Sequence, residues 1–315
     1  MRVLRSARPR ARSGQRLALA LLAAATMTAA GSGAAGSAAG SGAARSAAGS
    51  GAAHSAAGSG EARPAASSAL DRFDTVVLDA GHGGDDEGAR GAHDVVEKEL
   101  VLDVARRLRA RLGAAGLQVL LTRERDVYVP LEDRTTIANE ARGDLFVSIH
   151  ANAASARAAR GIETFFLSLE ASDDAARQVA ARENAAFRDL SVPAVPSDDP
   201  LVTILGDLAA SELMQESDEF ARLAQHEVSA LHGTPSRGVK QAPFVVLMGL
   251  EMPAALVEIG FVTNPQDARA LAAGEERDRI AEALARAVLE FGRRYDARRG
   301  IETAPAAPDR SAGGT

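Results

Sequence analysis

Short, nearly continuous apolar runs alternate with helical patterns between about residues 71 and 297, and this alternation limits the fold more than any other feature. Runs of this kind are typical of strands that are buried on both faces of a sheet. The run EKELVLDVARRLRARLG (97–113) instead repeats its apolar residues at helical spacing and stops at a glycine. The pattern therefore predicts an α/β fold whose sheet is covered by helices on both faces. The predicted strands are TVVLDA (75–80), LQVLLT (117–122), DLFVSIH (144–150), GIETFFL (161–167), FVVL (244–247) and AALVEIGFV (254–262).

The composition excludes several kinds of site. The 315-residue chain has no Cys, so it can form neither a disulfide nor a thiolate metal site. Any metal must therefore be held by His and carboxylate side chains. The net charge is −6 and no dense basic tract lies outside the N-terminus, which argues against nucleic acid as a partner.

Residues 1–30 have the pattern of a secretory signal peptide. Six arginines and no acid in MRVLRSARPRARSGQR precede the 14-residue apolar run LALALLAAATMTAA and then small residues. Because a spanning helix needs roughly 20 apolar residues, we expect a cleaved signal, with an uncleaved membrane anchor as the alternative. Loss of the six arginines would take the net charge from −6 to about −12. We therefore expect export to the periplasm or cell envelope, with no stable membrane insertion after cleavage.

Residues 31–70 are predicted to be a disordered linker. Within this range, residues 34–60 form three nearly identical nine-residue copies built from Ala, Gly and Ser. Such a sequence cannot form a core and behaves as a flexible tether. Residues 298–315 are likewise predicted to be a disordered tail. This leaves residues 71–297 as the single folded domain.

The stretch LDAGHGGDDEGARG (78–91) places His82 among glycines directly after a predicted strand. The glycine spacing fits neither GxGxxG nor the P-loop, and the acids at 85–87 would repel an anion, so a phosphate cradle is disfavoured. His150 ends another predicted strand, so both histidines can reach the same edge of a sheet. Two imidazoles there suit a metal, with polar turn residues that bond the loop backbone as the alternative.

Two glutamates extend this pattern. Glu97 opens the helix after the glycine loop and is the natural third ligand, because zinc sites of this kind add a carboxylate and leave a fourth position for water. The alternative is that Asp94 and Glu97 form a capping box. Glu258 lies in an apolar strand, where an unpaired carboxylate is costly unless it meets a cation or faces a cleft. There it can transfer a proton; the alternative is a salt bridge to Arg134 or Arg237.

Six ordered motifs resemble those of zinc-dependent N-acetylmuramoyl-L-alanine amidases, over about residues 74–295. The motifs are VVLDAGHGGDDEGARG with EKEL, LTRERDVYVPLEDRTTIAN, DLFVSIHANA, RGIETFFL, RGVKQAPFVVL and MPAALVEIGFVTN. The resemblance, to the amidase 3 catalytic domain, implies a mixed, roughly six-stranded sheet flanked by helices on both faces. It implies one zinc ion per chain, held by His82, Glu97 and His150. It also implies that Glu258 is the catalytic acid and base and that Arg134 has a structural role.

The reaction implied by the resemblance is hydrolysis of the amide between N-acetylmuramic acid and the L-alanine of the peptidoglycan stem peptide. Zinc would polarise the carbonyl and lower the pKa of its water. Glu258 would accept that proton and deliver it to the departing nitrogen. The process implied is cell-wall remodelling, in particular daughter-cell separation.

The helical region of about residues 170–232 is predicted to be an inserted regulatory segment outside the minimal sheet. In SDDPLVTILGDLAASELMQES, Asp199 suits an N-cap, Pro200 the first helical position, and Glu212 extends an apolar stripe. The segment is similar to the inserted helix that blocks the zinc cleft in division-associated members of the family. The hypothesis is that Glu212 takes the fourth zinc position in a resting enzyme. The resemblance implies a LytM-domain activator that pulls the helix away, whereas the alternative is a solvated glutamate.

Two other functions fit the same pattern. A non-catalytic wall-binding module could keep the fold, although all four zinc and acid–base positions are filled in this chain. A zinc carboxypeptidase acting on the stem peptide could also use His–Glu–His ligands on an α/β sheet. The products separate the three functions, since only an amidase releases stem peptides with a new L-alanine amino terminus.

Overall fold

The computed structural model describes residues 72–91, 94–186, 200–231 and 233–301, with the backbone alone at 186 and 200–210. Six strands form one sheet in the order β2-β1-β3-β6-β4-β5. All neighbouring strands are parallel except β4 and β6, which are antiparallel, so the sheet is mixed. This confirms the expected six-stranded α/β fold. The strands are β1 (Thr75–Ala80), β2 (Gln118–Leu121), β3 (Leu145–Asn152), β4 (Ile162–Leu167), β5 (Ser236–Ala242) and β6 (Ala254–Phe261).

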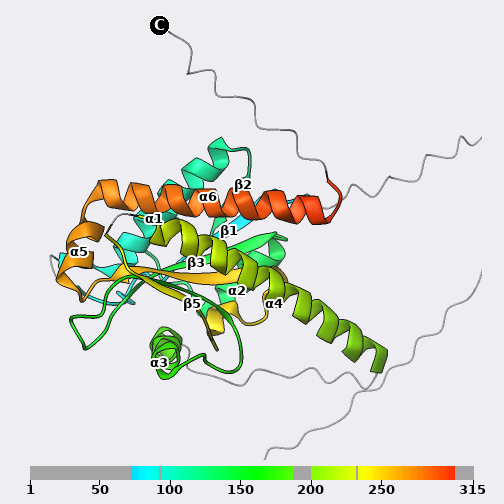
Figure 1. Cartoon of the computed structure of the whole chain (residues 1–315), viewed down its shortest axis with the longest axis horizontal. Helices are drawn as coiled ribbons and strands as arrows, with labels where there is room; N and C mark the ends of the chain where they lie inside the picture. Colours follow the sequence, from blue (N-terminus) through cyan, green and yellow to red (C-terminus); the bar gives the residue numbers. More distant parts are fainter. Residues whose placement is uncertain (1–71, 92–93, 187–199, 232, 302–315) are drawn as a thin grey trace, which may run out of the picture. The chain divides into compact units, whose positions relative to one another are not determined.

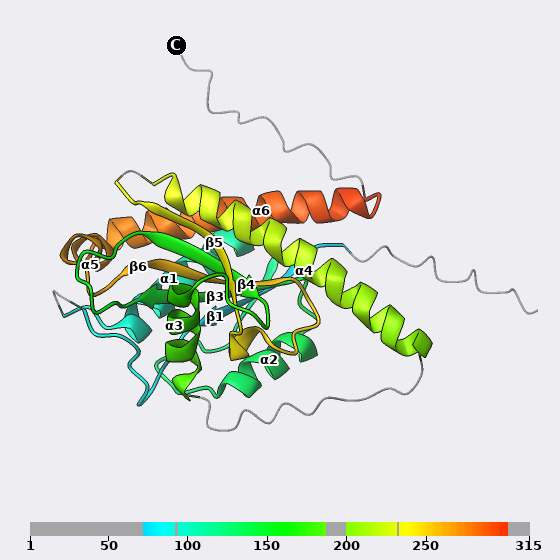
Figure 2. The same ribbon diagram turned by 60° about the horizontal axis from the view of Figure 1, so that its bottom comes forward.

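Helices cover both faces of the sheet (Figures 1 and 2). The helices are α1 (Glu97–Ala114), α2 (Leu131–Glu140), α3 (Asp174–Glu183), α4 (Pro200–Ser229), α5 (Pro265–Ala272) and α6 (Gly274–Arg298). Two short 3-10 turns are η2 (Asn184–Ala186) and η3 (Val245–Leu247). Residues of α1, α4 and α6 share one apolar cluster with the sheet, and we call this side the three-helix face. Residues of α2, α3 and η3 pack on the other side, the α3 face.

Strand alternation separates the chemistry of the two faces, because successive side chains of a strand point to opposite sides. On the three-helix face the central strands are apolar: Val76, Leu78, Leu145, Val147, Ile149, Ala255, Val257 and Ile259. On the α3 face they begin apolar, with Val77, Phe146 and Leu256. They then become polar yet stay buried: Asp79, Ser148, His150 and Glu258. The polar positions on all three strands therefore share one face and lie toward one end of the sheet.

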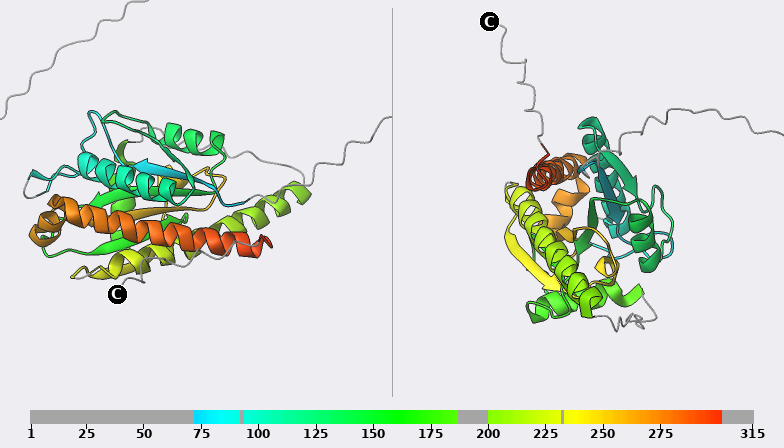
Figure 3. Two further views of the ribbon diagram at one scale, coloured as in Figure 1. Left: turned by 90° about the horizontal axis from the view of Figure 1, so that it is seen from above. Right: turned by 90° about the vertical axis from the view of Figure 1, so that its right-hand side faces the viewer.

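The segment 170–232, expected as an insertion, contributes no strand but forms part of both helical layers. The second half of α4 runs beside α6 (Figure 3) and buries Phe220 and Ala224 against the sheet. Gln225 accepts a hydrogen bond from Thr164 Oγ1 at 2.9 Å and donates one to the carbonyl of Ile162 at 2.9 Å. This half of the helix is therefore integral to the fold.

One predicted strand is wrong. The run FVVL does not extend the sheet: Val245–Leu247 forms the 3-10 turn η3, and its apolar residues fill the core of the α3 face. The sixth strand is SRGVKQA, β5, which lies at the edge of the sheet and is mostly half-buried. An edge strand needs less apolar character than a central one, so hydrophobicity alone selected the buried turn instead.

The expected signal peptide (1–30) and linker (31–70) lie outside the described residues, as does most of the expected tail. Within the described residues, no helix has both the length and the apolar character needed to cross a membrane.

Candidate metal centre

A glycine-rich turn carries His82 from the end of β1 toward the α3 face. His82 has a φ of 60°, and Gly83 and Gly84 also have positive φ, so the backbone reverses within three residues. At Gly88, which has a φ of 66°, a Cβ would lie 2.6 Å from both the Glu97 carboxylate and the His82 ring. The glycines therefore allow the tight turn and leave space for the side chains of His82 and Glu97.

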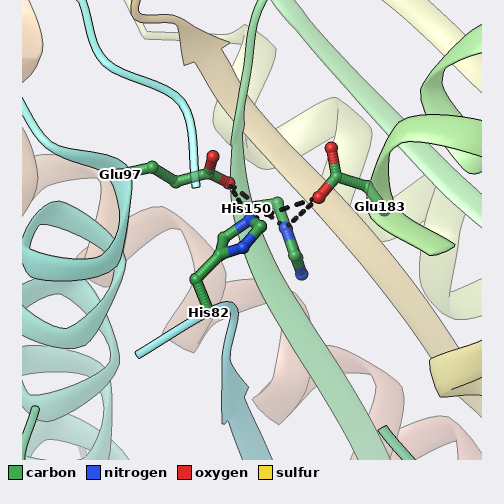
Figure 4. Close-up of side chains that lie close together, drawn as sticks. All are labelled: His82, Glu97, His150 and Glu183. Carbon is green, nitrogen blue, oxygen red and sulfur yellow. Dashed lines mark hydrogen bonds and ion pairs between the residues drawn. The ribbon is translucent and has the colours of Figure 1, made fainter. Parts of the chain in front are cut away.

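Two imidazoles and two carboxylates meet beyond this turn (Figure 4). His82 Nε2 lies 3.1 Å from Glu97 Oε1, and His150 Nδ1 lies 3.2 Å from the same oxygen. Glu183 Oε2 lies 3.2 Å from His82 Nε2 and 3.0 Å from His150 Nδ1. Glu97, His150 and Glu183 are buried, and His82 is nearly so. The structure thus brings together three residues singled out in the sequence and adds Glu183.

Surrounding groups fix the orientation of these side chains. His82 Nδ1 lies 2.9 Å from Asp86 Oδ2, which holds the ring by its second nitrogen. Glu97 accepts hydrogen bonds from the backbone amides of Ala89 and Ala151, at 2.8 and 2.9 Å, one on each carboxylate oxygen. The alternative capping role of Glu97 is wrong, because α1 begins after Val96 with no side-chain cap. Such outer contacts are typical of metal ligands, whose geometry depends on them.

The second carboxylate of the group, Glu183, corrects the hypothesis about Glu212. Glu212 is exposed on α4 and does not belong to this group. It lies one turn before Glu216, and the buried part of the helix, with Phe220 and Ala224, packs on the three-helix face. Glu183, in the last turn of α3, is the fourth member of the group, in the role that we expected for Glu212. Its signal in the sequence was of the kind that we assigned to Glu212: a carboxylate that continues an apolar helical stripe. The stripe in α3 consists of Ala176, Val179 and Ala180.

Arg182 ties the end of α3 to the sheet. Its guanidinium donates to Asn152 Oδ1 at 2.8 Å and to the carbonyl of Ala153 at 2.6 Å. Its Nε also lies 3.2 Å from Glu183 Oε1, the oxygen that faces away from the imidazoles. Asn152 in turn donates to the buried Glu163 at 2.7 Å. A continuous polar network therefore holds Glu183 in the group.

Glu258 lies beside the group on β6, directly paired with His150 on β3. It is fully buried, and neither carboxylate oxygen has a hydrogen-bond partner in the described part of the chain. Burial, reinforced by the nearby negative charge of Glu183, raises its pKa well above the ordinary value. The alternative salt bridges are wrong: Arg134 pairs with Asp79 at 2.8 Å, and Arg237 pairs with Glu163 at 3.0 Å.

Arg134 lies below the glycine turn, with 2% of its surface exposed. Besides its ion pair with Asp79, it donates to the carbonyls of Ala80 and His82, each at 2.9 Å, and to that of Val129. Asp79 also accepts from Thr122 and Ser148 at 2.7 Å each. This fully satisfied network joins α2 to β1 and supports the loop that carries His82.

The group of four strongly favours positive charge. Burial lowers the pKa of His82, but the adjacent carboxylates of Asp86, Glu183 and Glu97 outweigh burial and raise the pKa to about 12. Burial likewise opposes the effect of Glu183 and Glu97 on His150, whose pKa rises to about 10. The imidazoles lower the pKa of Glu97 and of Glu183 despite burial. The carboxylates therefore require protons on the imidazoles or a cation between them.

A zinc ion fits this donor set. One ligand atom from each of the four residues lies within 4.8 Å of all the others. His82 Nε2 and Glu183 Oε2 are buried without a hydrogen-bond partner among the described residues, which leaves both available to a cation. Imidazole nitrogen and carboxylate oxygen are zinc ligands, and a chain without Cys can offer no thiolate.

The group opens into a cleft of about 1010 Å³, large enough for an extended substrate. Its lining includes His82, Glu97 and Glu183 of the group and the half-exposed ring of Tyr128. Fold and site together define an α/β protein with a buried imidazole–carboxylate group that could hold a metal, beside an unpaired acid, an arrangement suited to hydrolysis.

Comparison with known proteins identifies the family. The protein-family model for amidase 3, described as N-acetylmuramoyl-L-alanine amidase, matches residues 76–290 of this chain. Amidase AmiA of Escherichia coli K12 is 36% identical over 222 residues, which cover 70% of this chain and 77% of AmiA. Amidase AmiC of Escherichia coli O6:H1 is 35% identical over 217 residues, which cover 68% of this chain and 52% of AmiC. The chain belongs to the N-acetylmuramoyl-L-alanine amidase family, as its motifs indicated.

Solved structures agree with this assignment. The structure of amidase AmiC2 of Nostoc punctiforme superposes with a TM-score of 0.52 at 28% identity, covering 70% of this chain and 97% of that one. The amidase of Clostridium difficile 630 gives the same TM-score, identity and coverage. Both matches span nearly the whole of the solved chains, so the shared part is the complete amidase fold.

Proposed function

We propose that this amidase uses zinc to hydrolyse the amide bond between N-acetylmuramic acid and the L-alanine of the peptidoglycan stem peptide. The observation that carries the proposal is the unpaired, buried Glu258 beside the His82, Glu97 and His150 group, all on one face of the sheet. An acid without a partner is costly to bury, and such a group beside a metal centre is typical of proton transfer.

Under this proposal His82, Glu97 and His150 hold the zinc ion, one per chain. When bound, the ion polarises the scissile carbonyl and lowers the pKa of water. Asp86 keeps the second nitrogen of His82 engaged, so the first faces the ion. Three protein ligands with one open position are the usual composition of a catalytic zinc site.

Glu258 moves the proton. As a carboxylate it removes a proton from the attacking water, whose oxygen bonds to the carbonyl carbon. As an acid it returns that proton to the amide nitrogen, and the carbon–nitrogen bond breaks. The products are a lactyl carboxylate on the sugar and a stem peptide with a free L-alanine amino group. A raised pKa suits both halves of this transfer, since the group must be able to hold the proton between them.

The reaction product tests the proposal directly. Purified chain loaded with zinc is incubated with peptidoglycan sacculi, and the soluble products are analysed by mass spectrometry. We expect stem peptides with a new L-alanine amino terminus, lost on chelation and in Glu258→Gln, and retained in the exposed control Glu251→Gln. Release of a terminal residue alone would identify a carboxypeptidase. Release of nothing by both the parent and Glu183→Ala, which removes the carboxylate that faces the imidazoles, would identify a binding module. Either result contradicts the proposal.

We further propose that the resting enzyme is self-inhibited by Glu183 rather than by Glu212. Glu183 lies within ligand distance of both imidazoles and stands where a substrate carbonyl or water must enter. Arg182 holds it there through three contacts with the sheet and with Glu183 itself. Release of α3 would open the fourth position. The activator that we propose is a LytM-domain protein without catalysis of its own.

A matched pair of variants tests self-inhibition. Glu183→Ala and Glu212→Ala each remove one carboxylate, the first from the group and the second from the exposed surface of α4. We expect Glu183→Ala to degrade peptidoglycan faster than the parent, and Glu212→Ala to match the parent. Arg182→Ala leaves every proposed ligand in place and should also raise the rate. If neither Glu183→Ala nor Arg182→Ala exceeds the parent, self-inhibition by α3 is wrong.

The cellular setting is also a proposal. The signal-like residues 1–30 support export to the periplasm or cell envelope, where peptidoglycan is found. The proposed process is cell-wall remodelling during daughter-cell separation. Residues 31–70 would tether the catalytic domain (71–297), with α3 and part of α4 as its regulatory element.

A further inference from the structure

Arg123, in the loop that follows β2, is a buried arginine whose hydrogen bonds all go to backbone carbonyls. Only 3% of its surface is exposed, and no carboxylate forms an ion pair with it among the described residues. Its Nε donates to the carbonyl of Ala80 at 2.8 Å, and its Nη2 donates to that of Gly81 at 2.8 Å. Nη2 also donates to the carbonyl of Lys98 at 2.8 Å. Because all of its acceptors are backbone carbonyls, this buried cation acts on the backbone and does not neutralise a carboxylate.

Apart from the carbonyl of Arg125 in its own loop, at 3.3 Å, the carbonyls that Arg123 binds belong to two separate segments. Ala80 and Gly81 directly precede His82 at the end of β1, whereas Lys98 directly follows Glu97 at the start of α1. One guanidinium therefore spans the two pieces of backbone that carry two of the proposed zinc ligands. Its planar fork of donors fixes the separation of the acceptors more closely than a lysine ammonium can.

The turn that carries His82 needs this support. His82 has a left-handed backbone at a φ of 60°, which a residue with a side chain adopts only when its surroundings impose it. Arg134 holds the carbonyl of His82 itself at 2.9 Å and shares that of Ala80. The two guanidinium groups thus bind three successive carbonyls, and Arg123 is the one that also reaches α1.

We propose that Arg123 is a positioning residue that sets the separation of His82 and Glu97, and so preorganises the metal centre before the ion binds. The proposal rests on the proposed function in one respect, the identity of the bound ion. It assigns to Arg123, the first arginine of LTRERD, a role that acts through the backbone and not through contact with substrate.

Two variants and one control test the proposal. Arg123→Lys keeps the charge but loses the fork, and Arg123→Gln keeps two donors but loses the charge. The control is Arg109→Lys on the exposed side of α1, where Arg109 pairs with Glu124 at 2.6 Å. Hydrogen exchange is measured by mass spectrometry on the metal-free protein, and zinc affinity by competition with a chromophoric chelator.

In the metal-free Arg123 variants, we expect amides of residues 81–99 to exchange about tenfold faster than in the parent, while those of α6 are unchanged. Zinc affinity should fall by about 10–100-fold, the usual effect of losing a group that orients ligands. Arg109→Lys should match the parent in both measurements.

The outcomes separate this proposal from the proposed zinc chemistry. Unchanged exchange in residues 81–99 overturns the positioning role, as does an equal rise in α6 or a failure of both variants to fold, which would assign Arg123 to global stability. Faster local exchange in a protein whose parent binds no zinc supports the positioning of the two segments and contradicts the zinc site alone.

Discussion

Replacing Gly81 with alanine should disable the proposed metal centre without unfolding the protein. Gly81 lies directly before His82, and a Cβ at this position would point at the ring of His150. It would lie 2.5 Å from Nε2 and 2.8 Å from Nδ1 of that ring, whereas ordinary contact begins near 3.4 Å. The ring must therefore retreat by about 1 Å, since the backbone of Gly81 is held by a hydrogen bond to the carbonyl of Ile149.

The structure offers His150 little room for that retreat. The side chain is 7% exposed, and its Nδ1 lies 3.2 Å from Glu97 and 3.0 Å from Glu183. A misplacement of about 1 Å at a reacting centre costs about 100-fold in rate, so we expect Gly81→Ala to lose about that much activity. Zinc affinity should fall with it.

Gly113 provides the matched control. It lies within α1, and a Cβ there would meet no atom within 4 Å. Gly113→Ala should therefore keep full activity and stabilise the helix by about 0.5–1 kcal/mol. The assay is release of soluble fragments from labelled peptidoglycan, with zinc affinity and urea unfolding in parallel. A Gly81→Ala protein that folds and works within about threefold of the parent would refute the steric reasoning.

Three further predictions follow from the buried polar groups. Arg134→Ala should lower the free energy of unfolding by about 3–5 kcal/mol, because it leaves Asp79 buried and unpaired, whereas the exposed Arg109→Ala should cost under about 1 kcal/mol; urea titration measures both, and similar losses would contradict the argument. Burial would raise the pKa of Asp79, but Arg134, Thr122 and Ser148 together lower it below the ordinary value. The contribution of ionised Asp79 to stability is thus complete above about pH 4 and is lost as the pH falls through the lowered pKa. The thermal midpoint of Asp79→Asn, measured against pH, should lack this part of the acid dependence. A pH profile identical to that of the parent would contradict the prediction. Removing zinc with a chelator should lower the thermal midpoint and abolish activity, and added zinc should restore both; a midpoint that chelation leaves unmoved would argue against an ion bound to the folded state.

The sequence predicts most of the fold because the central strands are apolar on both faces for most of their length. β1, β3 and β6 are correctly located for this reason, and the helical spacing of α1 and α6 is equally plain. The sequence pattern did not predict the edge strand β5, because most of its side chains are polar and half-buried and so show no apolar run.

The site divides in a similar way. His82 and His150 end apolar strands, and Glu97 opens a helix, so each stands at a recognisable break in the pattern. Glu183 and Glu212 look alike in sequence, since each continues an apolar helical stripe. Only packing distinguishes them: the end of α3 lies over the α3 face, whereas α4 packs on the three-helix face and leaves Glu212 exposed. Arg123 is missed because its partners are backbone carbonyls, which carry no residue identity.

The placement of the buried polar residues of β1, β3 and β6 on the α3 face has a consequence for recombining members of this family. In β3 and β6, odd-numbered residues face the apolar core of the three-helix face, and even-numbered residues face the α3 face and include His150 and Glu258. A graft that shifts either strand by one residue would exchange the two sets, so that the ligand enters the apolar layer while the composition stays the same. Chimeras must therefore conserve the parity of each strand, a constraint that sequence identity does not measure.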